Sequence, residues 1–452
     1  MAKYQKYAEY KDSGFEWADK LPVHWNSVHL KWISTIYAGG TPSKTIESYW
    51  ENGTIPWINS GAVNQTYILE PSTYITKAAY ENSSAKWIPK KALVMALAGQ
   101  GNTIGMVAQL GIDTTCNQSM GAIIPNDLDY ARYLFWWITS NYQNIRNMAG
   151  GDLRDGLNLE HLGDMHCPLP NKDEVQKIAN FLDYETAKID SLIAKQEKLI
   201  ELLKEKRQAV ISHAVTKGLN PDVKLKDSGV EWLGQVPEHW VTTKIKYVAE
   251  LTPKKSEVSS NNNRLCTFVP MEKLKLGSLI KDEEKPISEV IGGYTYFKNG
   301  DLLLAKVTPC FENKNMVVAS DLKNGIGFGS SEIYVLRTNY KVNTQFLYYR
   351  LQEDQFMELG TGAMTGAGGL KRVPSEFLNN FEFALPPLSE QIAITKYLNQ
   401  YLIKNEYLMN KAQSAIQLMQ ERRTALISSA VTGKIDVRNW QHPIEAKTGL
   451  SA

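Results

Sequence analysis

The clearest hydrophobic pattern in the chain is a heptad stripe that occurs once in each half. In the first half its two rows consist of Leu182, Ile189, Leu203 and Val210, and of Ile193, Ile200 and Ala214. The second half repeats the register with Leu398, Met419 and Leu426, and with Leu402, Met409, Ile416 and Ala430. Spacing of this kind over roughly five heptads predicts two long helices that pair as a coiled coil. The alternative is two separate amphipathic helices, each packed on its own domain.

Polar residues interrupt this stripe, as residues that fix the register of a coiled coil often do. They are Thr186, Gln196, Asn405 and Arg423. Roughly 35 helical residues span on the order of 50 Å. Segment 172–217 carries nine Lys or Arg and eight Asp or Glu, which predicts a solvated spacer and not a DNA-binding groove.

The regions before each stripe, 26–169 and 241–384, have a different pattern. Short β-like runs such as ALVMALA and DLLLAKV are separated by Gly, Asn and Pro. This pattern predicts two compact mixed α/β domains with exposed turns. Short helices are expected near 130–148 and 343–359. The two regions differ in sequence from each other, which suggests two different binding domains on one shared frame.

A second repeat frames these regions. KDSGFEWADKLPVHW begins at Lys11 and KDSGVEWLGQVPEHW at Lys226, with nine of fifteen positions identical. KRQAVISHAVTKG and RRTALISSAVTGK, which begin at Lys206 and Arg422, agree at seven of thirteen positions. The chain is therefore a tandem duplication.

The tryptophans of the repeated box are expected to be packing residues that make it a structural joint. These are Trp17, Trp25, Trp232 and Trp240. His24 and His239 are expected to be packed and hydrogen-bonded rather than catalytic. If the helices are antiparallel, the N-terminal box lies by the end of the second helix and the internal box by the end of the first.

Composition limits the class of protein. The chain has 452 residues, a net charge of +2 and four widely spaced cysteines without a CxxC pair. This cysteine usage indicates a reducing cytoplasm, and no segment is long and apolar enough to span a membrane. The near-neutral charge is mild evidence against nucleic-acid binding, so any DNA contact must depend on locally placed charges.

Motifs for catalysis and metal binding are missing from the sequence. GQGNTIG, from Gly99, is followed by the strand-like MVAQL, so a tight hairpin turn fits better than a phosphate-binding loop, which needs a helix N-terminus. GFGSS, from Gly327, also leads into a strand. His161, His166 and Cys167 have no further ligand at a zinc-like spacing. These absences indicate a binding protein rather than an enzyme.

Taken together, the motifs resemble the DNA-specificity subunit of type I restriction-modification systems over essentially residues 10–437. The family's DSGxEW and PxHW phrases occur twice, and GGTPS followed by YWENGTIPWI resembles the start of a target recognition domain. GDLLLAKVTPCFENKN and GIGFGSSEIYVLR in the second half are also typical of the family. Two departures are LPNKDEVQ, where LPPxxEQ is usual, and LTPKKSE, where GGTPS would stand.

The resemblance implies an α+β fold, a tandem duplication of two mixed α/β target recognition domains separated by two long helices that form a pseudo-twofold antiparallel coiled coil. The expected segments are repeat boxes at 1–25 and 218–240, target recognition domains at 26–169 and 241–384, spacer helices at 170–217 and 385–437, and a tail at 438–452.

It also implies a non-catalytic subunit that recognises a bipartite site in double-stranded DNA. Expected partners are two adenine-modifying methyltransferase subunits and restriction subunits with helicase and nuclease activity. S-adenosylmethionine, ATP and Mg²⁺ are expected on those partners, and no cofactor on this chain. A coiled-coil scaffold with two variable protein-binding domains and no DNA contact is the alternative.

Residues that contact DNA are expected in loops, because base edges and phosphates require Arg, Lys, Asn, Gln, Ser or Thr. Domain 1 offers Lys44, Asn59, Ser60, Gln100, Asn102, Asn117, Gln118, Ser119 and Arg154; domain 2 offers Lys306, Thr308, Asn313, Lys314, Ser330, Ser331, Lys371 and Arg372. The glycine-rich stretches GGDLRDG and TGAMTGAGGLKR either let the backbone approach phosphates or act as hinges. Neither domain is strongly basic, so binding by the isolated subunit is expected to be modest.

Overall fold

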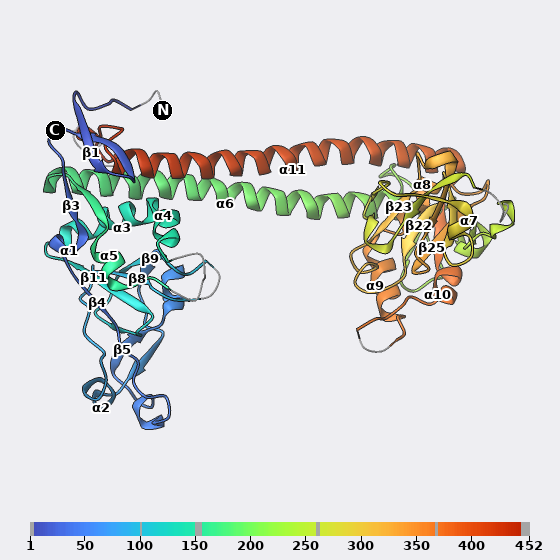
Figure 1. Cartoon of the computed structure of the whole chain (residues 1–452). Helices are drawn as coiled ribbons and strands as arrows, with labels where there is room; N and C mark the ends of the chain where they lie inside the picture. The colour runs from blue at the N-terminus through green and yellow to red at the C-terminus, as the bar shows by residue number, and fades with distance from the viewer. Residues whose placement is uncertain (1–3, 100–101, 150–155, 259–262, 367–368, 444–452) are drawn as a thin grey trace. The chain divides into compact units, whose positions relative to one another are not determined.

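The computed structural model describes residues 4–99, 102–149, 156–258, 263–366 and 369–443, which form two compact units (Figure 1). Unit 1 comprises Met1–Gln196 and Ser414–Ala452, and unit 2 comprises Glu197–Gln413. Each unit contains one α/β domain, one repeat box and a section of each long helix. No helix in the described ranges has the length and apolar character needed to cross a membrane.

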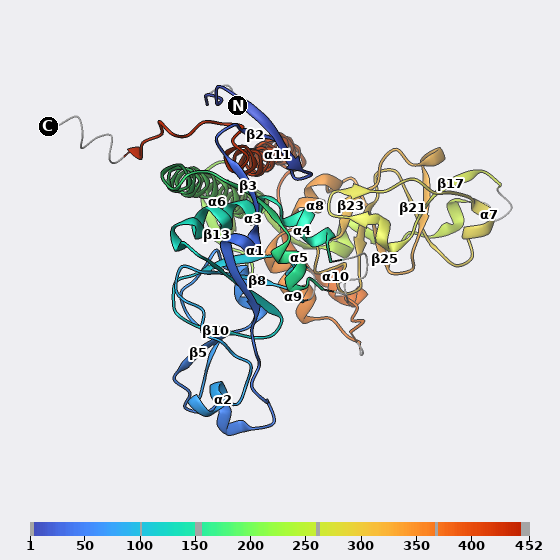
Figure 2. The ribbon, with the colours of Figure 1, turned by 60° about the vertical axis from the view of Figure 1, so that its left-hand side comes forward.

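The two heptad stripes form helices α6 (Lys172–Lys217) and α11 (Leu388–Val431), which run antiparallel beside each other within each unit (Figures 1 and 2). In unit 1 the Arg423 guanidinium donates to the Asp190 carboxylate at 2.8 Å. In unit 2 Asn405 Nδ2 donates to Leu203 O at 3.1 Å. The predicted pairing is thus confirmed, and two of the polar interruptions make contacts between the helices.

The N-terminal box forms a joint in unit 1 that contacts both helices. Trp25 is fully buried and lies against Gly433, just beyond the end of α11; a Cβ on Gly433 would be 3.2 Å from the indole and 2.5 Å from Pro22. His24 Nε2 lies 3.0 Å from the carboxylate of Glu174, in the first turn of α6. The hydroxyl of Tyr7 also donates to Glu174.

The internal box repeats this arrangement in unit 2. Trp240 is fully buried against Gly218, beyond the end of α6, and His239 Nε2 lies 2.7 Å from Glu390 in the first turn of α11. In both joints the indole Nε1 is buried without a hydrogen-bond partner among the described residues. Both histidines are hydrogen-bonded as predicted, but they are not packed in the interior, because the side chains of His24 and His239 are 38% and 48% exposed.

Both boxes begin with a hairpin. In unit 1, β1 (Tyr10–Phe15) pairs with β2 (Ala18–Pro22), and in unit 2, β13 (Leu225–Asp227) pairs with β14 (Gln235–Pro237). Trp17 lies 6.5 Å from Trp137, and Trp232 stacks on Phe381 at 4.8 Å between ring centroids. These tryptophans pack as predicted.

Domain 1 is built on a five-stranded sheet with the order β4-β11-β8-β9-β6. Its strands are β4 (Ser34–Ala38), β6 (Tyr67–Ile68), β8 (Leu93–Ala96), β9 (Val107–Leu110) and β11 (Met120–Pro125). A smaller sheet, β10-β5-β7, contains β5 (Ile55–Ile58), β7 (Thr73–Ile75) and β10 (Thr115–Cys116). With α2 (Lys77–Glu81), this smaller sheet lies at the side of the domain away from α6 (Figures 1 and 2).

Domain 2 is built on a four-stranded sheet with the order β16-β25-β22-β23. Its strands are β16 (Ala249–Leu251), β22 (Leu302–Ala305), β23 (Met316–Val318) and β25 (Ile333–Thr338). The second sheet, β20-β17-β24-β21, contains β17 (Leu265–Val269), β20 (Glu284–Pro286), β21 (Thr295–Lys298) and β24 (Ile326–Gly329). A short hairpin pairs β18 (Leu274–Lys275) with β19 (Ser278–Leu279), and α7 (Ile287–Val290) follows β20.

The remaining short elements connect each sheet to the long helices. Unit 1 has α1 (Leu30–Ile33), α3 (Ala131–Ser140), α4 (Tyr142–Asn147), α5 (Leu159–Gly163) and the pair β3 (Asn26–His29) with β12 (His166–Leu169). Unit 2 has α8 (Thr344–Arg350), α9 (Asp354–Gly362), α10 (Ser375–Asn380) and the pair β15 (Val241–Lys244) with β26 (Glu382–Leu385). The helices predicted near 130–148 and 343–359 are present.

The duplication therefore extends through the two domains, although their sequences differ. β4-β11-β8-β9 in domain 1 corresponds to β16-β25-β22-β23 in domain 2, with the same order and the same antiparallel pairings. Each second sheet also contains one parallel pair, β5 with β10 and β17 with β24. Backbone hydrogen bonds define this frame, so strands of different sequence can build it.

The sequence prediction of a tight hairpin turn at GQGNTIG needs correction. β8 and β9 do form an antiparallel hairpin, but the connection runs over 97–106, of which 100–101 lie outside the described residues. Thr103 O accepts from Met106 N, and Ala96 O accepts from Gly105 N, at 3.0 and 2.9 Å. The local turn is thus at 103–106, inside a longer loop.

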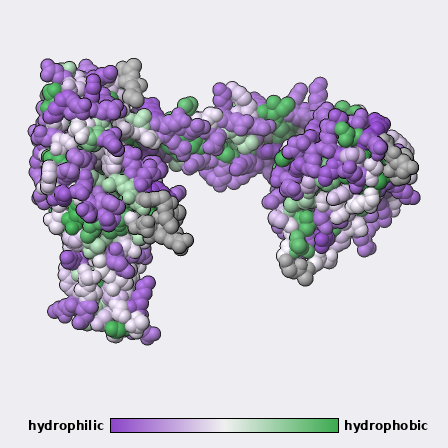
Figure 3. Space-filling model, viewed as in Figure 1, coloured by the Kyte–Doolittle hydropathy of each residue, from purple (hydrophilic) through white to green (hydrophobic). Residues whose placement is uncertain are grey.

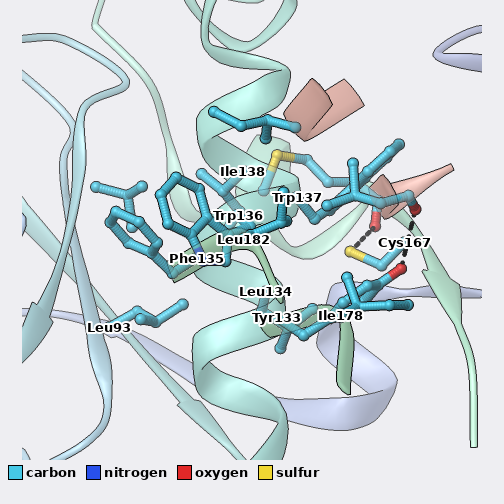
Figure 4. Close-up of a cluster of buried hydrophobic side chains, with 14 of the residues drawn as sticks. Leu93, Tyr133, Leu134, Phe135, Trp136, Trp137, Ile138, Cys167, Ile178 and Leu182 are labelled. Carbon is cyan, nitrogen blue, oxygen red and sulfur yellow. Dashed lines mark hydrogen bonds between the residues drawn. The ribbon is translucent and has the colours of Figure 1, made fainter. Parts of the chain in front are cut away.

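Domain 1 is attached to the long helices by an apolar core. Figure 4 shows side chains of α3, among them Tyr133 and Trp137, next to Ile178 and Leu182 of α6. Burial raises the pKa of the Cys167 thiol in this core to about 12. The Trp137 indole donates to His166 O at 3.1 Å, and Tyr133 donates to Pro168 O at 3.0 Å. Because these side chains are buried, the sheet of domain 1 is held at a fixed position on α6.

Candidate nucleic-acid interface

Three loops meet at one end of the central sheet in domain 1, and we call this region loop end 1. They are 97–106 after β8, without residues 100–101, which lie outside the described part of the chain, 117–119 before β11, and the segment 156–158 that leads into α5. Leu97 N donates to Ser119 O at 2.8 Å, and Leu157 N donates to Leu97 O at 2.7 Å. In an antiparallel pair, the C-terminal end of one strand lies beside the N-terminal end of its neighbour. The loop after β8 therefore meets the loop before β11, although the two are distant in sequence.

Loop end 2 in domain 2 has the same construction. Its loops are 306–315 after β22, 330–332 before β25, and 363–374 between α9 and α10. Lys306 N donates to Glu332 O at 3.0 Å, and Val373 N donates to Lys306 O at 2.8 Å. These bonds occupy the same positions in the frame as the two bonds of loop end 1.

Five of the predicted residues in domain 1 line one hollow of about 730 Å³ at loop end 1. They are Lys44, Asn59, Asn117, Gln118 and Ser119. Asn117 Oδ1 is buried and accepts no hydrogen bond from the described residues. A buried acceptor without a partner is costly, so this loop carries a polar group that the described part of the fold leaves unsatisfied.

The GGTPS segment forms one side of this hollow. Gly39 N donates to Met120 O at 3.0 Å, and Gly40 N donates to Cys116 O at 2.8 Å. A Cβ on Gly39 would lie 2.2 Å from Cys116 O, so a side chain has no room at this position. Thr41 Oγ1 donates to Gln118 Oε1, which orients that amide. The glycine pair thus brings this segment against the loop that carries Asn117 and Gln118.

Two tryptophans line the same hollow and were not among the predicted site residues. Trp50 and Trp57 pack edge to face with 5.2 Å between ring centroids. The Trp57 indole donates to Gly40 O at 3.0 Å, and the Trp50 indole donates to Ser43 O at 3.1 Å. Both tryptophans belong to the segment YWENGTIPWI, which the sequence identifies as a motif of the family. The motif did not indicate that these side chains line the hollow.

The other predicted residues of domain 1 that the structure describes do not line this hollow. Ser60 begins a 3-10 helix (Ser60–Asn64), for which Asn59 is the N-cap residue, and Asn59 Oδ1 accepts from Gly61 N at 2.9 Å. Asn102 lines a second hollow, of about 670 Å³, and accepts from Arg146 at 3.3 Å. Gln100 and Arg154 lie outside the described residues, as does most of the GGDLRDG stretch.

Loop end 2 is organised around Glu332. The Arg372 guanidinium donates through Nε to Oε2 at 2.9 Å and through Nη2 to Oε1 at 2.8 Å, while Lys306 Nζ lies 4.0 Å from Oε2. The hydrogen bond from Arg372 and the positive charges of Lys306 and Arg372 hold the pKa of Glu332 below its usual range. Glu332 is absent from the predicted set because that set was limited to Arg, Lys, Asn, Gln, Ser and Thr.

The remaining predicted residues of domain 2 divide into two groups. Ser330 and Ser331 precede Glu332 directly, and Thr308 accepts from Lys371 N at 3.0 Å, so these residues and Lys371 belong to loop end 2. Asn313 is exposed in loop 306–315. Lys314 instead donates to Gln352 O and Asp354 Oδ1 at 2.9 and 2.7 Å, which engages its ammonium group within the protein.

The glycine-rich stretch of domain 2 is partly fixed. Thr365 and Arg372 exchange backbone hydrogen bonds of 3.0 and 2.8 Å, and residues 367–368 lie outside the described part of the chain. This pairing fixes the backbone at Arg372.

Two copies of one α/β frame, each with a polar loop end of different composition, define a protein built by tandem duplication. The family model of the type I restriction modification DNA specificity domain matches the chain twice, at residues 22–202 and 237–418. The chain belongs to this family.

Curated relatives of the chain match it over different shares of its length. The EcoAI specificity subunit of Escherichia coli is 33% identical over 43% of this chain, and that match spans only 33% of the subunit. The StySPI specificity subunit of Salmonella potsdam is 21% identical, over 93% of this chain and 91% of the subunit.

Solved structures with the same fold cover nearly the whole chain. A chain from a study of complex assembly and conformational transition of the type I R-M system has a TM-score of 0.68, with 15% identity over 92% of this chain and 99% of its own length. The HsdS subunit from Thermoanaerobacter tengcongensis has a TM-score of 0.55, with 15% identity over 92% of this chain and 98% of its own.

Proposed function

We propose that this chain is the sequence-reading subunit of a type I restriction-modification complex and recognises a bipartite site in double-stranded DNA. Loop end 1 reads one half-site and loop end 2 reads the other. The observation that carries this proposal is the repetition of one backbone frame with different polar side chains on two pairs of equivalent loops, those after β8 and β22 and those before β11 and β25. Recognition of two unlike DNA sequences requires such an arrangement, because base identity is read by side chains.

The chain itself is proposed to be non-catalytic. Among the described residues, no group of three or more His, Cys, Asp or Glu side chains is placed to hold a metal ion. The transfer of a methyl group to adenine and the cleavage of DNA are assigned to modification and restriction subunits, with S-adenosylmethionine, ATP and Mg²⁺ bound there. The role of this chain is then to select the DNA sequence on which those subunits act.

Partner docking is proposed on the long helices. Apolar side chains interrupt the hydrophilic surface of these helices on the face shown in Figure 3. Ile403 on α11 is 70% exposed, and with Ile392 it lines a hollow of about 290 Å³ beside α8. Exposed apolar side chains on a helix are typical of a surface that binds another protein.

The test is methylome sequencing of a host that carries the modification subunit with or without this chain. Methylated adenines in a two-part motif that require this chain are expected. Removing one heptad from α6 and the facing heptad from α11 is expected to shorten the unspecified gap and leave both half-sites unchanged. An unchanged gap would refute the role of the helices in spacing, and methylation independent of this chain would refute the recognition role.

Docking has its own test. Ile403→Asp is expected to reduce the number of modification subunits that co-purify with the chain, because a carboxylate would be placed in the apolar contact. Lys404→Asp, at the next, exposed position of the same helix, is the matched control and should retain them. Equal retention by both variants would exclude this face of α11 from docking.

A further inference from the structure

Arg372 and Glu332 form an ion pair at loop end 2. The equivalent of Glu332 in the backbone frame is Ser119, as the matching hydrogen bonds from Lys306 N and Leu97 N show. The side chain of Arg372 is 48% exposed, and that of Glu332 is 26% exposed. The pair therefore lies at the surface of loop end 2 while its carboxylate is partly covered.

The guanidinium of Arg372 is held in one orientation. Its Nε–Nη2 edge is engaged with both oxygens of Glu332. Its backbone is fixed by the two hydrogen bonds with Thr365, and that of Glu332 by the bond to Lys306. The Nη1–Nη2 edge remains, and Nη1 donates no hydrogen bond to the described residues. A planar guanidinium that is held by hydrogen bonds along one edge can donate from its other edge to a pair of acceptors.

The charge of the pair favours a neutral acceptor. A phosphate near Arg372 would also approach the carboxylate of Glu332, and this repulsion would offset part of its attraction to Arg372 and to Lys306, whose Nζ lies 4.0 Å from the same carboxylate. A base edge carries no net charge, so this cost is absent. Among base edges in the major groove, guanine presents two adjacent acceptors, O6 and N7, which match the two donors of an arginine fork.

We propose that Arg372, oriented by Glu332, reads a guanine in the half-site recognised by domain 2. Lys371, the preceding residue, is exposed and donates no side-chain hydrogen bond to the described residues, and it contacts a backbone phosphate instead. This inference rests on the proposed function and deepens it, because it assigns one base to one side chain.

The experiment uses the full chain assembled with its modification subunits and a DNA library in which the half-site of domain 2 is randomised. The wild-type complex is expected to require a G·C pair at one or more positions. Arg372→Gln should lower the preference for guanine at a single position by about 5- to 100-fold and leave the other positions unchanged. Glu332→Gln should weaken the preference at that same position by a smaller factor.

Two variants serve as controls. Lys371→Gln should reduce methylation of all sequences by a similar factor and lower the salt dependence of binding by about one phosphate contact. Lys323→Gln removes a different surface ion pair, the one between Lys323 and Glu284. Lys323 precedes β24, whereas Ser330 follows it, so this pair lies at the other end of the strand from loop end 2. It should change neither specificity nor activity.

The outcomes separate the two proposals. A wild-type complex without any sequence preference would refute the proposed function. A wild-type preference that Arg372→Gln leaves intact, or reduces equally at every position of the half-site, would refute the role of Arg372 alone. Thermal melting of Arg372→Gln and Glu332→Gln shows whether a loss of methylation at all sequences is caused by unfolding. Glu332→Gln tests the same base position without removing the arginine.

Discussion

At loop end 1 the loops meet at Leu97 and Ser119, and at loop end 2 they meet at Lys306 and Glu332. The backbone hydrogen bonds that join them occupy the same positions in both domains. The side chains differ: amides, two tryptophans, Lys44 and two glutamates line the hollow of loop end 1, whereas a lysine and an arginine lie against one carboxylate at loop end 2. The frame therefore tolerates different side chains at its loop ends, because the bonds that shape it come from the main chain.

The two joints show the opposite behaviour. In each, a buried tryptophan lies against a glycine beyond one long helix, and a histidine contacts a glutamate in the first turn of the other. Side chains, and not only the backbone, make these contacts, so the sequence of the box is repeated. The molecule thus combines repeated joints with loop ends that differ.

The largest expected effect comes from removing a joint tryptophan. Trp25→Ala should destabilise unit 1, and Trp240→Ala unit 2, each by about 3–5 kcal/mol, because a fully buried indole leaves a cavity. Hydrogen exchange resolved by residue measures each unit separately. Trp32→Ala is the control, since Trp32 is 63% exposed and its loss should cost less than about 0.5 kcal/mol. Very unequal losses in the two units would show that the joints are not equivalent.

The sequence predicted the features that depend on side-chain pattern. Heptad spacing identified α6 and α11, and the repeated box identified the joints, because buried contacts of this kind require particular residues. The shared strand order of the two domains was not visible, since main-chain hydrogen bonds impose little sequence. Loop composition indicated residues that meet at the loop ends, such as Asn117 and Arg372. It could not show that Lys314 would contact Asp354, because that pairing depends on the position of α9.

A smaller and unequal effect is expected at the two histidine contacts. The carboxylate of Glu174 is 2% exposed and that of Glu390 is 27% exposed. His24→Ala leaves a buried carboxylate with one fewer partner and should cost unit 1 about 1–3 kcal/mol. His239→Ala should cost unit 2 less than about 1 kcal/mol, because water can replace the histidine at Glu390.

The same hydrogen-exchange measurement compares these two variants. Combining His24→Ala with Glu174→Gln should recover part of the loss, because a neutral amide is less costly to bury than a carboxylate. Equal costs for His24→Ala and His239→Ala would mean that the difference in burial between the two glutamates does not matter for stability.

The smallest expected effect is a difference in the rate at which cysteines near the two loop ends react with an alkylating reagent. Cys116 directly precedes loop 117–119 and is buried, which raises its pKa to about 12, so its thiolate fraction at pH 8 is on the order of 1 in 10,000. Cys310, in loop 306–315, is partly exposed. Iodoacetamide should therefore label Cys310 first, and Cys310→Ser should remove the fast phase seen by mass spectrometry.

If loop end 2 binds DNA, a duplex with the recognised site should slow labelling of Cys310 several-fold in the assembled complex, whereas a duplex with that half-site scrambled should not. If neither duplex slows the labelling, the DNA does not cover Cys310, and loop 306–315 is excluded from the contact.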